Sequence, residues 1–262
     1  MSKLLVPDHA GAKMRPSPNF GPRNDGIVPD AIILHYTGMA SGALAEDRLC
    51  NVEAEVSAHY LIHENGRIVQ MVPEAARAWH AGASFWSGAT DMNSHSIGIE
   101  IANAGHPNAD PSQPAPAFET VQISAVIALC QGIIQRWNIK PERVLAHSDV
   151  SVGRKIDPGE MFPWAKLHEA GVGHFIAPSP IRGGRFFHRG DSGQPVEALQ
   201  SMLALYGYKV QINGEFDLET EKVVNAFQRH FRPERIDGVA DSSTIETLHR
   251  LLRSIPRTEA IS

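Results

Sequence analysis

The sequence predicts an α/β fold, a mixed central sheet flanked by helices, followed by a second, smaller three-helix domain. Short β-rich runs alternate with segments of helical periodicity in the first part of the chain, which is typical of α/β domains. A stretch rich in Pro, Gly and Arg follows, and after it the periodicity is wholly helical. We therefore predict an α/β domain over residues 1–176, a linker over 177–190 and a helical domain over 191–262.

The composition argues against nucleic-acid binding and against a membrane span. The chain has 262 residues, with 24 Lys and Arg against 29 Asp and Glu, a net charge of −5. Nucleic-acid binding needs clustered cations, so we expect no nucleic-acid partner. The longest apolar run, residues 125–130, is far shorter than the ~20 residues that cross a bilayer, so we expect no membrane span.

The N-terminus and the two cysteines bear on the location of the protein. The apolar stretch after Lys3 ends at Pro7, too early for the core of a signal peptide, which favours the cytoplasm. Cys50 and Cys130 lie in apolar, helix-like surroundings. We interpret both as buried free thiols, which suits a reducing compartment.

The first part of the chain predicts an irregular arm, a buried strand, a helix and a β-hairpin. Frequent Pro, Gly and Asn residues predict the arm, and an Asn-Gly turn at residues 65–66 predicts the hairpin. The expected ranges are 1–29 for the arm, 31–36 for the strand, 43–51 for the helix, and 58–63 and 67–72 for the hairpin.

The next predicted strand, residues 96–102, has two different faces. Ile97, Ile99 and Ile101 alternate with Gly98 and Glu100, so Glu100 should point away from the apolar face. A strand over 144–147 and a loop over 148–162 are expected further on. Between them we predict a long amphipathic helix over 118–137 that buries Phe118, Val121, Ala125, Leu129, Ile133 and Trp137.

The predicted helical domain contains an internal repeat. Residues 213–217 and 237–241 each combine an Asn-Gly or Asp-Gly turn with an Asp placed to cap the next helix. The expected helices are at about 195–206, 218–231 and 243–253. Their expected apolar anchors are Val196, Leu199, Leu203, Val223, Phe227, Phe231, Ile245, Leu248 and Leu251.

Three potential metal ligands follow predicted strands. His35 lies at the exit of the first strand, His147 at the exit of the last, and Asp157 ten residues later. Two imidazoles and one carboxylate would leave a fourth position of a zinc ion open, as in catalytic zinc sites. By pattern alone a single histidine is more often a structural residue, so the set is a hypothesis at this point.

Five segments together resemble the type-2 zinc N-acetylmuramoyl-L-alanine amidases, which share a fold with peptidoglycan-recognition proteins. They run in family order and comprise residues 33–37, 57–62, 77–82, 96–101 and 146–164. The helical segments resemble a peptidoglycan-binding domain through residues 190–193, 196–200, 213–217, 226–228 and 237–241.

The resemblance implies roles for individual residues. His35, His147 and Asp157 match the ligands of one zinc ion. Glu100 matches the catalytic acid and base, and Lys155 the cationic stabiliser. Amide hydrolysis needs both, because one group must take up and return a proton while a positive charge stabilises the oxyanion.

The side chains around this set carry weaker signals. Ala58 stands where phage and animal relatives carry a tyrosine, so a tyrosine-assisted route is not available at that position. Trp79 and His80 fit the rim of a saccharide and peptide cleft, with core packing under the hairpin as the alternative. His59 is expected to support a neighbour or pack in the sheet, and His63 to lie at the surface.

The function predicted is zinc-dependent hydrolysis of the amide between N-acetylmuramic acid, or its anhydro form, and the L-alanine of the peptidoglycan stem peptide. We expect muropeptides as substrates and a monomer. One alternative is a non-hydrolytic peptidoglycan sensor, and another is a zinc peptidase that acts on protein. The helical domain would bind cell wall, shape the cleft, or do both. The two-domain layout resembles exported relatives, so the cell envelope is the alternative location.

Overall fold

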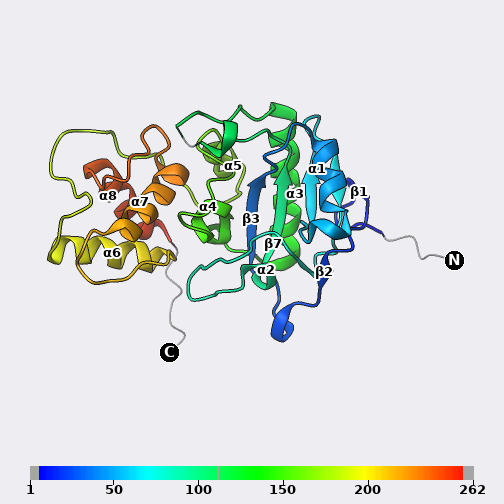
Figure 1. The fold of residues 1–262 in the computed structure, drawn as a ribbon, viewed down its shortest axis with the longest axis horizontal. Coiled ribbons are helices and arrows are strands. Elements are labelled where there is room, and N and C mark those ends of the chain that lie inside the picture. Colours follow the sequence, from blue (N-terminus) through cyan, green and yellow to red (C-terminus); the bar gives the residue numbers. More distant parts are fainter. Residues whose placement is uncertain (1–5, 111, 256–262) are drawn as a thin grey trace.

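The computed structural model describes residues 6–110 and 112–255, and its centre is a six-stranded mixed sheet with helices on both faces (Figure 1). The strand order is β1-β5-β4-β7-β3-β8, and only the β4–β5 hairpin is antiparallel. This confirms the predicted fold class. The strands are β1 (Ala12–Met14), β3 (Ala31–Tyr36), β4 (Tyr60–Ile62), β5 (Ile68–Gln70), β7 (Ser96–Ile101) and β8 (Val144–Ala146), and a separate pair joins β2 (Phe20–Gly21) to β6 (Arg77–Ala78).

Eight α-helices lie in the described part of the chain. Five belong to the part that contains the sheet, and the last three form a bundle at the C-terminal end (Figure 1). They are α1 (Gly42–Leu49), α2 (Met92–His95), α3 (Thr120–Trp137), α4 (His147–Val150), α5 (Trp164–Glu169), α6 (Gln194–Tyr206), α7 (Leu218–Phe231) and α8 (Ser242–Ser254). None of the helices that the structure describes is long and apolar enough to cross a membrane.

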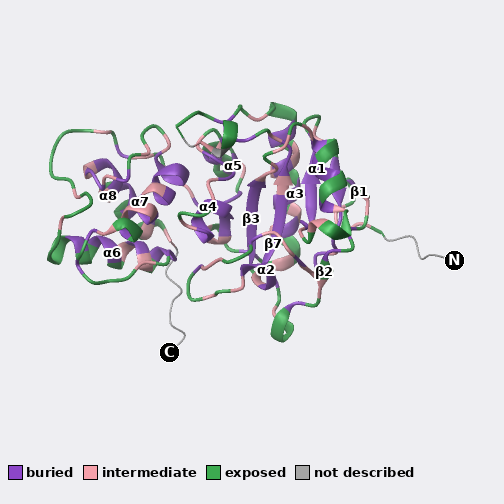
Figure 2. Cartoon of the chain, viewed as in Figure 1, coloured by how far each residue is buried: buried purple, intermediate pink, exposed green. Residues whose placement is uncertain are grey.

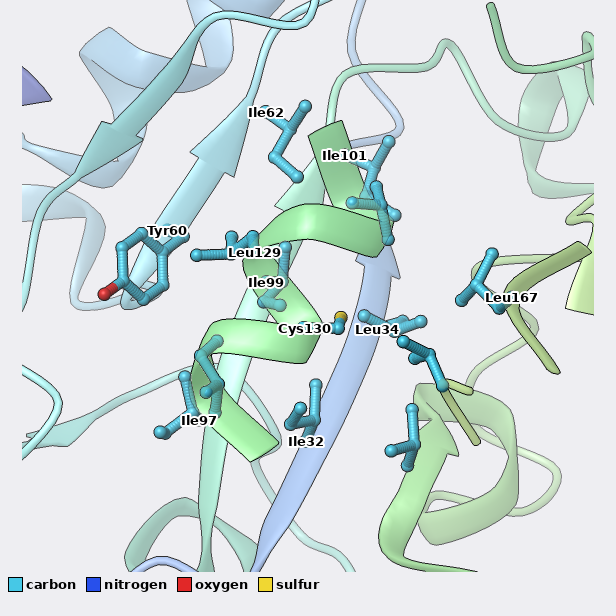
Figure 3. Packing of buried hydrophobic residues seen from close by; sticks show 14 of the residues in the cluster. Ile32, Leu34, Tyr60, Ile62, Ile97, Ile99, Ile101, Leu129, Cys130 and Leu167 are labelled. Atoms are coloured by element: carbon cyan, nitrogen blue, oxygen red, sulfur yellow. The ribbon is translucent and has the colours of Figure 1, made fainter. Parts of the chain in front are cut away.

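Helix α3 covers one face of the sheet and forms the main core with it (Figure 3). Ile97, Ile99 and Ile101 of β7 are fully buried there, as their alternation predicts. The predicted helix face was partly wrong, because Val121 is 53% exposed. Helix α3 is apolar on more than one side, so contact with the sheet decides which stripe is buried. That stripe is Ile123, Val126, Leu129, Cys130 and Ile133.

The opposite face of the sheet carries the polar side chains. Along β3, Ile33 and His35 alternate with the residues that face α3, and on β7 Glu100 pairs in register with His35. Leu61 and Val69 of the hairpin pack on α1 on this same face. The two-residue period of the strands therefore places His35 and Glu100 side by side, away from the main core.

Two predicted loop regions contain regular structure. Within the predicted arm, Ala12–Met14 pairs in parallel with β5 and Phe20–Gly21 pairs with β6, while residues 1–5 lie outside the described residues. Helix α4 begins at His147, which was predicted as the last residue of the strand, and ends at Val150 within the predicted 148–162 loop. These elements have only two to four residues, too few for a periodic pattern, and long-range pairing defines them.

The three C-terminal helices agree with their predicted ranges within one or two residues, and their predicted caps are confirmed. Asp217 and Asp241 each accept a hydrogen bond from a backbone amide of the first turn, both at 2.8 Å. The bundle shares one apolar core with the sheet, in which Ile33 and Leu145 are part of the same cluster as Leu203 and Phe227. Buried residues therefore continue from the sheet into the bundle (Figure 2).

Two smaller predictions need correction. Cys130 is a buried free thiol as predicted, but Cys50, also free, is only half-buried. His63 is buried rather than at the surface, because its Nε2 lies 2.7 Å from the carboxylate of Glu46, which also binds Arg67. Glu46 lies 17 residues before His63, so the position of His63 beside a turn gave no sign of this contact.

Candidate metal centre and active site

Three potential ligand atoms meet at one edge of the sheet. His35 is near the end of β3, His147 follows β8, and these neighbouring parallel strands end at the same edge. His35 Nδ1 lies 2.9 Å from His147 Nδ1 and 3.1 Å from Asp157 Oδ2, and the last two atoms are 2.9 Å apart. All three residues are buried, and the set can hold a metal ion.

In both His35 and His147, Nε2 has a partner outside the triangle, which leaves Nδ1 to bind a metal ion. His147 Nε2 lies 3.1 Å from the carbonyl oxygen of Ala81. A carbonyl only accepts, so Nε2 carries the hydrogen and Nδ1 of the neutral ring presents a lone pair. His35 Nε2 lies 3.0 Å from His80 Nδ1, which gives His35 the same arrangement when His80 accepts.

The charge states of these residues suit a cation. Burial, together with the charge of His147, lowers the pKa of His35 to about 4, so its ring is neutral at pH 7. Burial alone would raise the pKa of Asp157, but the neighbouring His147 and His35 lower it overall, so a carboxylate faces the site. Zinc ligands at about 2.0–2.1 Å from the ion lie about 3.3 Å apart in a tetrahedron. The observed separations of 2.9–3.1 Å come close to that requirement.

Glu100 lies beside this triangle of donors and has an unusual environment. Its Oε2 is buried without a hydrogen-bond partner among the described residues. Burial and the negative charge of Asp157 raise its pKa well above the ordinary value, and Lys155 opposes part of that rise. A carboxyl group with raised pKa is suited to exchange protons near neutral pH.

A cleft of about 410 Å³ opens over these groups. Its lining includes every residue for which the sequence predicts a role in the site, so the fold brings all seven together. They are His35, Trp79, His80, Glu100, His147, Lys155 and Asp157.

His80 lies deeper in the site than a rim residue would. Its ring packs over Gly98 of β7, where an added Cβ would come within 2.4 Å of His80 Cγ. Only glycine leaves that space. Burial and the charge of His35 lower the pKa of His80 well below its usual value, so a neutral ring faces His35 Nε2. Trp79 is half-buried and lines the cleft.

One buried network beside the cleft was not predicted. The hydroxyl of Tyr36 lies 3.0 Å from Nδ1 of His106, and Nε2 of His106 lies 3.0 Å from the carboxylate of Glu160. Each residue stands 54 or more positions from its partner, and no local motif surrounds His106. A single sequence carries no signal for such a contact.

Comparison with known proteins matches each of the two parts of the chain to a known family. The family described as N-acetylmuramoyl-L-alanine amidase matches residues 25–160, and the putative peptidoglycan binding domain family matches residues 192–248. The N-acetylmuramoyl-L-alanine amidase AmiD of Escherichia coli (strain K12) is 40% identical over 234 residues, which cover 84% of this chain and 81% of that protein. The chain belongs to the N-acetylmuramoyl-L-alanine amidase family.

Solved structures of this family extend the match to both halves of the chain. The Escherichia coli AmiD structure, a complex with the substrate anhydro-N-acetylmuramic acid-L-Ala-D-gamma-Glu-L-Lys, covers 91% of this chain and 92% of its own, with TM-score 0.73 and 37% identity. AmpDh3 from Pseudomonas aeruginosa, in complex with anhydromuramic pentapeptide, covers 90% and 93%, with TM-score 0.69 and 31% identity. The predicted family, enzyme class and amidase function are therefore confirmed.

Proposed function

We propose that this amidase uses one zinc ion, held by His35, His147 and Asp157, to cleave the amide between anhydro-N-acetylmuramic or N-acetylmuramic acid and L-alanine. The observation that carries the proposal is the triangle of two imidazole nitrogens and one carboxylate oxygen, within 3.1 Å of each other, beside Glu100. The amidase family and the ligands named in its solved complexes support the choice of substrate.

The chemistry divides between the ion and the protein side chains. When bound, zinc would supply Lewis acidity and lower the pKa of a water molecule. Glu100 takes the proton from the attacking water and returns it to the alanine nitrogen as the amide breaks. Lys155 places a positive charge beside the oxyanion that forms on the lactyl carbonyl. The acceptor character of His80 keeps His35 in the required tautomer.

Mass spectrometry of the products tests this proposal. Purified protein is incubated with anhydro and intact muropeptides, with and without a chelator. Zinc is then added in excess to the samples that contain chelator. We expect a free stem peptide that starts at L-alanine, lost with the chelator and restored by zinc. No cleavage of either muropeptide would favour the sensor, and cleavage of casein or a dipeptide amide instead would favour the peptidase.

A variant of Glu100 separates catalysis from metal binding. Glu100→Ala should lower turnover by about 10² to 10⁴-fold, the usual contribution of a general acid and base, while zinc content stays at the wild-type level. The comparison variant is Trp79→Ala, which should mainly raise KM, since we propose that Trp79 contacts the substrate. If Glu100→Ala keeps most of the activity, the role assigned to Glu100 is wrong.

The division of the chain and its setting are also part of the proposal. We propose a catalytic unit over residues 1–176, a linker over 177–190 and a peptidoglycan-binding unit over 191–262. The monomeric state and the cytoplasmic location, with the cell envelope as the alternative, stay predictions. Light scattering of the purified protein tests the first, and fractionation of cells that express the complete gene tests the second.

A further inference from the structure

A second cavity lies next to the catalytic cleft, between the loop after α4 and helix α7 of the C-terminal bundle. We name it the α7 cavity; it has a volume of about 390 Å³, and its lining includes Gly153, Lys155, Ile156, Lys222, Asn225 and Arg229. Lys155 and Ile156 line the catalytic cleft as well, so the two spaces adjoin. A substrate that extends from the cleft past Lys155 therefore meets α7.

The lining of the α7 cavity is one-sided in charge. Three cations, Lys155, Lys222 and Arg229, line it, and none of its described lining residues is acidic. The chain as a whole carries a net charge of −5, so this concentration of positive charge runs against the overall balance. A concave site lined by cations of one sign attracts an anion.

Arg229 is the most informative of the three cations. Arg229 is buried, with a side chain only 10% exposed, yet its Nε has no hydrogen-bond partner among the described residues. The carboxylate oxygen of Glu160 is 4.0 Å from that Nε and already 3.0 Å from His106. Glu160, at this distance, is the only ion-pair partner of Arg229 among the described residues, so the positive charge that Arg229 contributes to the cavity lining is left for an anion.

The side chain of Lys222 reaches the same cavity by packing against Gly153. Gly153 has φ +71°, and a Cβ there would come within 2.7 Å of Lys222 Cδ, so only glycine lets the methylenes of Lys222 pack across this loop. The ammonium of Lys222 pairs with Glu219 at 2.7 Å on an exposed part of α7. Of these two cations of α7, Lys222 is the more exposed, at 34% of its side chain, and Arg229 is the buried one, at 10%.

The anion follows from the ligand bound by the relative AmiD. In a stem L-Ala-D-gamma-Glu-L-Lys, the γ-linkage leaves the α-carboxylate of the glutamate free, and the lysine ends in a second carboxylate. They belong to the second and third residues after the scissile amide, and an extended chain spans roughly 3.3–3.6 Å per residue. An arginine guanidinium binds a carboxylate through charge-assisted hydrogen bonds, often two in parallel.

We infer that the α7 cavity binds a carboxylate of the stem peptide beyond L-alanine, so that Arg229 and Lys222 of the C-terminal bundle form part of the substrate site. The identity of this ligand rests on the proposed function. The inference gives the bundle a role in specificity for a single soluble muropeptide, which is distinct from attachment to the cell wall.

Kinetics of Arg229→Met on matched substrates test the inference. With anhydro-N-acetylmuramic acid-L-Ala-D-gamma-Glu-L-Lys we expect KM to rise about 10 to 100-fold with little change in kcat, as for one lost charge-assisted hydrogen bond. Lys222→Met should give a smaller rise, and Arg229→Lys should restore part of the loss. Two further substrates, one with the glutamate α-carboxylate and one with the terminal carboxylate converted to an amide, identify which group is bound. On the substrate that lacks the bound carboxylate, Arg229→Met and wild type should have the same KM.

Two controls separate the possible failures. Lys209→Met removes an exposed positive charge of the same bundle outside the cavity and should leave KM unchanged. Equal losses on all substrates with a lower melting temperature, or unchanged KM in both Arg229→Met and Lys222→Met, would overturn the inference while the amidase activity stands. Calorimetric titration with the free tripeptide L-Ala-D-gamma-Glu-L-Lys needs no catalysis: weaker binding by Arg229→Met supports the cavity even if the proposed reaction fails, and equal binding overturns it.

Discussion

Helix α4 has only four residues, yet it contributes to two buried polar clusters of opposite character. At its first position His147 faces His35 and Asp157, and two residues later Asp149 faces the C-terminal bundle. Asp149 Oδ1 accepts from the hydroxyl of Tyr208 at 2.6 Å, and Oδ2 lies 2.7 Å from Nδ1 of His230 and accepts from the amide of Ala146 at 2.8 Å.

The two clusters differ in how donors and acceptors are matched. Around Asp149 each carboxylate oxygen meets at least one donor, so this carboxylate is satisfied within the protein. Burial and the charge of Asp149 raise the pKa of Tyr208 well above its usual value, which keeps its hydroxyl protonated as a donor. Around His147, three acceptor atoms face one another when both rings carry their hydrogen on Nε2, and a bound cation would satisfy all three.

This comparison separates a structural cluster from a functional one. A buried polar group that is satisfied internally stabilises the fold, whereas buried acceptors that converge without donors are held together for an external partner. Both clusters use α4, so the contact with the bundle also fixes the helix on which His147 is placed.

Replacing His147 by Ala should give the largest effect on function. We expect turnover to fall by about 10³-fold or more, since an amidase without a complete ligand set loses several kcal/mol of transition-state stabilisation. The unfolding free energy of the metal-free protein should change less than in the Asp149 variant described next. Zinc content, turnover and urea unfolding in the presence of a chelator measure these quantities. A variant that binds zinc normally would contradict the ligand assignment.

Replacing Asp149 by Ala should instead act on stability. Tyr208 and His230 would lose their buried partner, and breaking such a cluster costs about 3–5 kcal/mol of unfolding free energy. Urea unfolding of metal-free wild type and variant measures the difference. Tyr208→Phe removes one hydrogen bond only and should cost about 1–2 kcal/mol. Equal stability of Asp149→Ala and wild type would show that the cluster does not hold the bundle in place.

Replacing His80 by Ala tests how the functional cluster is supported. The Nε2–H of His35 would lose its acceptor, and such outer partners usually contribute 10 to 100-fold in metal affinity. Competition with a fluorescent zinc chelator measures the dissociation constant. His80→Asn keeps an acceptor oxygen and should recover part of the affinity, whereas His188→Ala, at an exposed site, should change nothing. If His80→Ala leaves affinity unchanged and only raises KM, His80 acts on the substrate alone.

Glu100→Gln should make the metal-free protein slightly more stable at neutral pH. The pKa of Glu100 is raised in the folded state by burial and by Asp157, so its ionisation costs folding free energy. That cost is absent below the unfolded pKa of about 4.5 and grows as pH rises through the folded pKa. We expect a gain on the order of 1 kcal/mol at pH 7 that disappears at pH 4, measured by chemical unfolding. A constant difference at all pH values would contradict this origin.

The sequence predicted those parts of the fold that have a local pattern. The alternation of Ile97, Ile99 and Ile101 gave the correct face for Glu100, and the repeated Asp caps gave the C-terminal helices. Strand β1 was missed, because three residues carry no period. The buried stripe of α3 was partly wrong at Val121, since two sides of that helix are apolar and only the sheet selects between them.

For the candidate site, the resemblance of five short segments to the amidase family supplied the ligand set and Glu100, and the fold brings these residues into one cleft. His63 and His106 show the limit of this reasoning. The carboxylate of Glu46 contacts His63, and Tyr36 and Glu160 contact His106; each of these three partners lies at least 17 residues from its histidine.

The sequence by itself therefore determined the class of enzyme, the order of most helices and strands, and which side chains could carry the chemistry. Periodicity, turns and caps act between neighbouring residues, and so they can be read along the chain. Only the tertiary structure decided that His147 and Asp149, two positions apart, face two different clusters, and that Arg229 lines the same cavity as Lys155 with no hydrogen-bond partner for its Nε among the described residues. The reason is physical: burial and donor–acceptor matching depend on groups far apart in sequence, which only folding brings into contact.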